Sequence, residues 1–149
     1  MRVLVLVAVL VSGSALPAGA DEATDKEAVK AVVKAAYVDG VHAVGDPEAM
    51  RRGFHSGFNM LVLKDGQMSA VPIADWIARL EKAGSASQGK PRPAIKAEFT
   101  LVDVTGDAAV TRVEIFRAGR HVFTDYLSLY RFPDGWKIVG KTFFAHPQG

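Results

Sequence analysis

The last third of the chain, from Gly106 to Pro147, constrains the fold more than any other segment. It contains three runs rich in β-branched and aromatic residues, and turns at Thr105-Gly106-Asp107, Ala118-Gly119-Arg120 and Pro133-Asp134-Gly135 separate them. Apolar and polar side chains alternate along these runs, which is typical of an antiparallel meander with one buried face. The segment therefore predicts an amphipathic sheet that needs a cover on one side.

Signals for helices lie in the first half of the chain. A capping-box pattern starts at Thr24, and an apolar stripe at helical spacing follows it as far as Gly40, a plausible terminator. Asp46 and Pro47 predict the N-cap and the first residue of a short second helix. A third helix is expected after Pro72. Its apolar face would carry Ile73, Trp76, Ile77 and Leu80.

The order of these elements indicates the fold class. A hairpin is expected over residues 58–71, with Asp65-Gly66 as its tight turn. Helices followed by a long antiparallel meander indicate an α+β fold rather than alternating βαβ units. Only the N-terminal helices are available to cover the sheet. A strongly curved sheet over helices would enclose a cone with a cavity.

The first twenty residues have the pattern of a secretory signal peptide. A short basic start at Met1-Arg2 precedes the apolar run Val3–Val11, and Ala18-Gly19-Ala20 offers a small-x-small cleavage site. The apolar run is short for a permanent membrane anchor, which is the alternative. We therefore expect residues 1–20 to be removed, residues 21–149 to form one domain, and the protein to be secreted or periplasmic.

Composition excludes several functions. The chain has no Cys, so thiol catalysis and Cys-based zinc sites are ruled out. Its 18 basic and 16 acidic residues leave a formal charge of +2, and the basic residues are scattered without interleaved aromatics, which argues against nucleic acid as a partner. There is no Gly-rich phosphate loop and no Gly-x-Ser-x-Gly nucleophile elbow. No cofactor is expected, and no metal site either, because the four histidines show no helical i, i+4 pairing and no close clustering with carboxylates.

Several short motifs together resemble a known family. They are Ala36-Tyr37-x-x-Gly40, Gly45-Asp46, Phe54-His55, Phe123-Thr124-Asp125-Tyr126-Leu127-x-Leu129, Asp134-Gly135-Trp136-Lys137-Ile138-Val139-x-Lys141 and His146-Pro147. This combination resembles the putative lumazine-binding family, in the nuclear transport factor two-like superfamily that also holds the SnoaL-like polyketide cyclases. Ser56 departs from the pattern, where Pro is expected. The resemblance implies a cone-shaped α+β fold, often dimeric through its sheet, and no particular reaction.

Asp125 interrupts the apolar face of the middle run. By strict alternation that face should point into the cone, and it carries His121, Phe123, Asp125, Leu127 and Leu129. A carboxylate among apolar side chains must be paired, hydrogen-bonded or shifted upward in pKa. Asp125 is therefore either a pocket acid or base, or a structural acid paired with Lys141, Arg112 or His55.

Four other side chains are candidates for contact with a ligand. They are Tyr37, His55, Trp76 and Phe123. His55 should lie at the mouth of the cone, where an imidazole could shuttle protons. Ordinary core packing is the competing interpretation of each side chain. On a neighbouring strand, Arg112 and Glu114 share one face and should form a solvated or dimer-facing ion pair.

Three functions remain open on this basis. The favoured one is a module that binds a small apolar or aromatic molecule. The second is a cofactor-free isomerase, cyclase or dehydratase that uses Asp125 and His55 as proton carriers. The third is a sheet-mediated interaction module. A homodimer is expected in any case, through the outer sheet face. That face would carry Val122, Thr124, Tyr126 and Tyr130.

Overall fold

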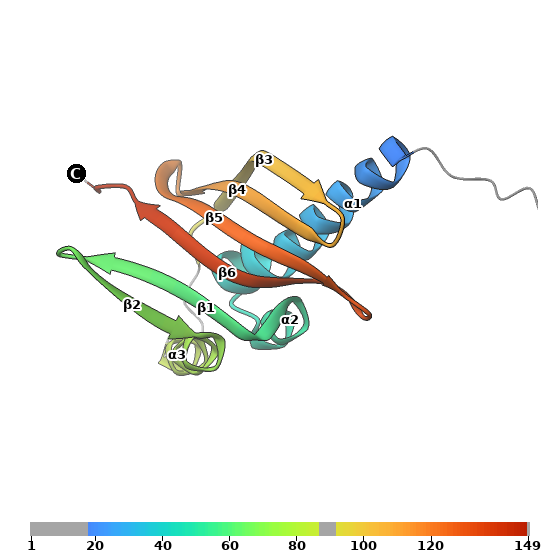
Figure 1. The fold of residues 1–149 in the computed structure, drawn as a ribbon. Helices are drawn as coiled ribbons and strands as arrows, with labels where there is room; N and C mark the ends of the chain where they lie inside the picture. Colours follow the sequence, from blue (N-terminus) through green and yellow to red (C-terminus); the bar gives the residue numbers. More distant parts are fainter. Residues whose placement is uncertain (1–17, 87–91, 149) are drawn as a thin grey trace, which may run out of the picture.

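The computed structural model describes residues 18–86 and 92–148 of the chain, which form helices packed on a single curved sheet (Figure 1). The proposed signal peptide lies almost entirely outside the described residues. Within those residues, no helix is both long and apolar enough to cross a membrane. The α+β class predicted from the order of elements is confirmed.

The helices follow the predicted order, with corrections at their ends. They are α1 (Ala18–Val33), the π-helical η1 (Lys34–Ala43), α2 (Pro47–Gly53) and α3 (Ile73–Ala86). Helix α1 begins upstream of Thr24, so the capping box predicted there is wrong. Gly40 does not end the helix either, because η1 continues through it. A Cβ at Gly40 would lie 3.2 Å from the carbonyl oxygen of Ala35 and 3.4 Å from the Cβ of Ala49, so the space there is tight for a side chain.

Helix α2 starts as its sequence predicts. The side chain of Asp46 accepts hydrogen bonds from the backbone amides of Glu48 and Ala49, at 2.9 and 3.2 Å, with Pro47 in the first turn. These bonds satisfy two of the amides that a helix start leaves without partners. The Asp46 cap thereby fixes where α2 begins, and strand β1 follows directly after the end of this helix.

Six strands form one sheet in the order β2-β1-β6-β5-β4-β3. The strands are β1 (Phe54–Lys64), β2 (Gln67–Pro72), β3 (Ile95–Thr105), β4 (Ala108–Arg117), β5 (Arg120–Phe132) and β6 (Gly135–Ala145). All neighbouring strands are antiparallel except β1 and β6. Asp65 and Gly66 both have positive φ in the β1–β2 turn, as expected for a tight hairpin.

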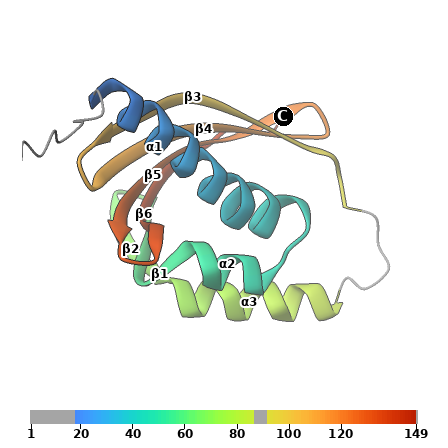
Figure 2. The ribbon, with the colours of Figure 1, turned by 90° about the vertical axis from the view of Figure 1, so that its right-hand side faces the viewer.

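The sheet curves over helix α1, while α2 and α3 lie side by side below α1, next to the β1–β2 hairpin (Figure 2). The hydrophobic core fills the space between the concave face and the helices. It includes Val33, Met50, Phe58, Ile115, Leu127 and Ile138, all fully buried. The predicted cone is therefore closed by side chains over much of its length.

Two of the β-bulges in the sheet, on β5 and β6, decide which of the candidate site residues face the core. Between β4 and β5, Ile115 pairs with Phe123 but Phe116 pairs with His121, so Val122 is the extra residue. Since one extra residue reverses the alternation beyond it, His121 lies on the outer face, and its prediction for the inner face is wrong. Between β5 and β6 the extra residue is Val139.

Candidate functional site

A buried group of three polar side chains lies at the centre of the concave face. The hydroxyl of Tyr37 donates a hydrogen bond of 2.5 Å to Oδ2 of Asp125, and Nζ of Lys141 lies 2.9 Å from Oδ1 of the same carboxylate. Tyr37 and Asp125 are fully buried, and Lys141 is 6% exposed. Of the arrangements expected for Asp125, the structure shows pairing with Lys141.

Each member of this group comes from a different element. Tyr37 lies in η1, Asp125 in β5 opposite Val113, and Lys141 in β6 opposite Leu127. Lys141 faces inward because of the bulge at Val139. Without that extra residue, continued alternation from Trp136 and Ile138 would turn Lys141 toward solvent. A glycine inside a strand often marks a bulge, so Gly140 is the sequence signal for this inversion.

Aromatic rings surround the ammonium group of Lys141. Its Nζ lies 4.4 Å from the ring centroid of Phe143, 5.0 Å from that of Tyr37, 5.5 Å from that of Trp76 and 5.8 Å from that of Phe123. Such distances allow cation–π attraction. Trp76, Phe123 and Phe143 are partly exposed, so this aromatic rim connects the buried group with solvent.

The environment shifts the protonation of the buried groups. Burial raises the pKa of Tyr37 well above its usual range, and the negative charge and hydrogen bond of Asp125 add to this, so the Tyr37 hydroxyl stays protonated and serves as a hydrogen-bond donor. Burial also lowers the pKa of Lys141, although the charge of Asp125 opposes the shift. The opposite charges of Asp125 and Lys141 thus hold the two side chains together, while the ammonium of Lys141 is more acidic than that of an ordinary lysine.

His42, which the sequence reasoning did not single out, belongs to the same region. Its ring meets that of Tyr37 edge-on at 4.8 Å and lies 5.9 Å from that of Phe123. Burial, together with the positive charges of Lys141 and Arg117, lowers the pKa of His42 to about 3. Among the described residues, Nε2 of His42 is buried without a hydrogen-bond partner. Oδ1 of Asp125 has Nζ of Lys141 as its partner, at 2.9 Å.

His55 does not lie beside Asp125 as the proton-carrier hypothesis requires. Its ring stacks on Phe132 at 4.6 Å, and its Nδ1 accepts a hydrogen bond from the amide of Gly57. Phe132 and Asp125 are seven positions apart on β5, about 23 Å along an extended strand. The irregular β1–β6 register places His55 at the β5–β6 hairpin, away from the aromatic rim.

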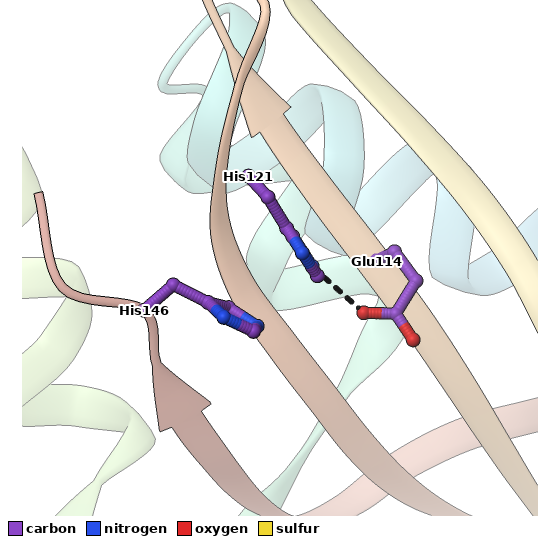
Figure 3. A group of neighbouring side chains, drawn as sticks. All are labelled: Glu114, His121 and His146. Carbon is purple, nitrogen blue, oxygen red and sulfur yellow. Dashed lines mark hydrogen bonds and ion pairs between the residues drawn. The ribbon is translucent and has the colours of Figure 1, made fainter.

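A second polar cluster lies on the outer face of the sheet. Glu114, His121 and His146 point toward one another there (Figure 3), with their ligand atoms within 4.8 Å. The expectation that histidines would not cluster with carboxylates is therefore wrong. Arg112 pairs with Glu114 at 2.7 Å as expected, but Glu114 is buried rather than solvated.

The buried carboxylate of Glu114 is well supported. Burial raises its pKa, but hydrogen bonds from Thr124 and His121 and the charges of Arg112 and His121 outweigh this, so the pKa lies below its usual value. The hydroxyl of Thr124 donates to Oε2 at 2.5 Å. The cluster thus holds an ionised carboxylate next to two partly exposed imidazoles.

Two hollows on the surface lie away from Asp125, while a third, of 290 Å³, is lined by Tyr126 and Lys141. One of 670 Å³ lies between the start of α1 and the β3–β4 turn, beside Asp25 and Arg131. Another, of 350 Å³, lies between α2 and α3 and is lined by Phe54, Ile73 and Ile77. Because Asp125 and Tyr37 are fully buried, any molecule that approaches them must first contact the aromatic rim.

The fold is that of the nuclear transport factor two-like class. A protein of this class from Shewanella baltica, of unknown function, is 24% identical, with a TM-score of 0.68 and coverage of 85% of this chain and 97% of its own. One from Silicibacter pomeroyi, also of unknown function, is 24% identical, with a TM-score of 0.65 and coverage of 83% and 98%. One from Methylobacillus flagellatus is 21% identical, with a TM-score of 0.64 and coverage of 83% and 94%.

The family model described as putative lumazine-binding matches residues 24–144, and the chain belongs to that family. The resemblance seen in the motifs is thereby confirmed. No curated protein sequence matches the chain significantly. The family is one of ligand-binding domains, and the ligand of this member is not identified by any of these matches.

Proposed function

We propose that this domain binds a small aromatic or largely apolar molecule at the aromatic rim formed by Trp76, Phe123 and Phe143. The observation that carries the proposal is that Nε2 of His42 is buried without a hydrogen-bond partner beside these partly exposed rings. A buried polar atom without a partner is uncommon, and a ligand with a polar edge would supply the missing bond.

The rim favours a flat ring over an aliphatic chain. Trp76 and Phe123 present partly exposed aromatic rings, while neutral His42 can donate or accept according to its tautomer. A heteroaromatic ring with amide-like N–H and C=O groups would match both features. Lumazine itself has this chemistry, so it is a suitable first probe.

We also propose that the protein works outside the cytoplasm. Residues 1–20 have the basic, apolar and small-residue regions of a signal peptide, which supports export. The domain without Cys requires no disulfide in that compartment, so its stability there would depend on packing.

Catalysis is a second candidate function, with different residues from those first expected. Lys141 has a lowered pKa and lies beside Asp125 and the protonated Tyr37, whereas His55 is remote. The ammonium of Lys141 can donate a proton to a bound molecule and the carboxylate of Asp125 can accept one, and a cofactor-free isomerisation or dehydration requires both steps. This alternative replaces the Asp125–His55 pair by Asp125, Lys141 and Tyr37.

Native mass spectrometry of the purified protein, followed by tryptophan fluorescence titration, tests the binding proposal. Mass spectra would reveal a co-purified molecule, and lumazine would serve as the added probe. We expect quenching of Trp76, at least about tenfold weaker binding in Phe123→Ala, and a similar loss in Asp125→Asn. Trp76→Phe separates the signal of Trp76 from that of Trp136.

His55→Ala is the matched control, because its ring lies at the far end of β5 and should leave binding unchanged. Equal affinity in Phe123→Ala and in the unmodified protein would contradict the proposed site. If neither lumazine nor any co-purified molecule binds, the closely packed core would instead favour the interaction module. Chemical conversion of a bound molecule, lost in Lys141→Met, would establish the catalytic alternative.

A further inference from the structure

Three strands bring a set of metal-ligating side chains together on the outer face. Glu114 comes from β4, His121 from β5, and His146 follows the end of β6. Nε2 of His121 lies 2.8 Å from Oε2 of Glu114, and Nε2 of His146 lies 2.9 Å from the hydroxyl oxygen of Thr124. Two imidazole nitrogens and one carboxylate oxygen therefore converge from three separate elements (Figure 3).

We propose that Glu114, His121 and His146 form a binding site for a divalent transition-metal ion, with Zn²⁺ as the best fit. Two imidazoles and one carboxylate with a remaining open position are a common ligand set for zinc. Zinc bonds of about 2.1 Å place tetrahedral ligand atoms about 3.4 Å apart. The three ligand atoms already lie within 4.8 Å of one another, so small side-chain rotations would complete the site.

The surroundings hold the carboxylate in place for such an ion. Arg112 binds the other oxygen, Oε1, at 2.7 Å, and the hydroxyl of Thr124 donates to Oε2. Partners of this kind orient the ligands of metal sites. Glu114 is buried, whereas the side chain of His121 is 33% exposed, so an ion could reach the carboxylate from solvent past the imidazole rings.

The C-terminal segment is able to adjust to an ion. The backbone amide of His146 bonds to the carbonyl of Val122, which brings its ring over that of His121 at a centroid separation of 3.7 Å. An ion would replace this stacked arrangement by a shared bond and would tie the end of β6 to β4 and β5. The same contacts without an ion would form a simple hydrogen-bond network, and zinc binding distinguishes the two.

The test is a zinc titration of the purified chain without a polyhistidine tag, after treatment with a chelator. We expect one Zn²⁺ per chain by calorimetry, a higher melting temperature with zinc, and visible d–d bands typical of low coordination with Co²⁺. His146→Ala is the decisive variant, because His146 lies at the end of β6 and its loss should leave the fold intact by circular dichroism. It should weaken binding at least about tenfold, as should His121→Ala.

His55→Ala is the matched control and should bind zinc like the unmodified protein, because its ring stacks on Phe132 far from the cluster. Thr124→Val, which keeps the shape but removes the hydroxyl, should weaken binding by about tenfold. Affinity no tighter than about 1 mM would overturn the proposal. Stoichiometric binding that survives both His121→Ala and His146→Ala would overturn it equally, because the ion would then lie elsewhere.

Discussion

At the scale of single residues, the charges of Asp125 and Lys141 depend on each other. Both are buried, and each is the other's counter-charge at 2.9 Å. Replacing a buried pair by apolar residues often costs little, whereas removing one partner leaves an uncompensated charge. Substitutions in the Asp125–Lys141 pair therefore distinguish a structural role of Asp125 from a functional one.

We predict that Asp125→Asn destabilises the domain by about 3–5 kcal/mol, because it leaves Lys141 buried without a counter-charge. Chemical denaturation of the two forms measures the difference. Adding Lys141→Met to Asp125→Asn should recover a large part of the loss.

If Asp125→Asn proved neutral or stabilising while ligand binding fell, Asp125 would be a pocket acid maintained at the expense of stability. A marked loss of stability with unchanged binding would instead remove it from the site.

His42 predicts a pH dependence of stability. Its pKa is about 3 in the folded protein but near 6.5 in an unfolded chain, so the unfolded state binds more protons between these values. Stability should therefore fall as the pH drops from about 6.5 toward 3, with a slope of up to about 1.4 kcal/mol per pH unit from this residue.

Denaturation curves of the unmodified protein and of His42→Gln, recorded across this pH range, test that prediction. The variant lacks the titrating group, so the difference in unfolding free energy between the two proteins should change with pH in the stated direction. Parallel stability profiles would show that His42 titrates alike in the folded and unfolded states.

At the scale of the elements, the turn between β4 and β5 carries avoidable strain. Ala118 has a φ of 49° and Gly119 a φ of 79°, and a side chain other than Asn, Asp or Gly is unfavourable in the left-handed region. We predict that Ala118→Asn stabilises the domain by about 0.5–1 kcal/mol. Gly119→Ala should act in the opposite direction. Thermal melts that show no gain for Ala118→Asn would contradict this account of the turn.

Strict alternation along a strand predicts the facing of side chains only as far as the next β-bulge. The inward positions of Asp125 and Leu127 follow directly from strict alternation. The bulge at Val122 turns His121 outward, and the bulge at Val139 turns Lys141 inward. Pairing with neighbouring strands and the curvature of the sheet place such extra residues, and a single strand's pattern does not specify them.

At the scale of the whole molecule, the outer face of the sheet remains partly apolar. Tyr126 and Tyr130 are 43% and 52% exposed on this face, and Phe144 is 57% exposed. Thr124, expected in the same patch, is instead buried beneath the histidine cluster. The patch that could contact a partner is therefore centred on the tyrosines.

We predict a homodimer through this patch, in an isologous contact. Light scattering at micromolar concentration should give twice the chain mass, and Tyr126→Glu should shift the protein toward the monomer by placing like charges opposite each other. A monomer mass for the unmodified protein would count against the prediction. Lys64→Glu, at the exposed β1–β2 turn, serves as a charge control.

Export predicts a defined N-terminus. The secreted protein should begin at Asp21, because Ala18-Gly19-Ala20 provides the cleavage signal. N-terminal sequencing of the protein from the culture medium or periplasm measures this directly. A secreted form that still starts at Met1 would contradict it. In the structure helix α1 already begins at Ala18, so cleavage would fall within its first turn.

Local patterns in the sequence determined the fold class, the order of its elements, the cap at Asp46, the Asp65-Gly66 turn and the inward position of Asp125. Each depends on a few neighbouring residues, through backbone preference or the period of the side chains. The tertiary structure alone decided that Lys141 and Tyr37 surround Asp125, that His55 lies elsewhere, and that Glu114, His121 and His146 meet. These contacts join residues far apart in the chain, and strand register, bulges and sheet curvature determine them.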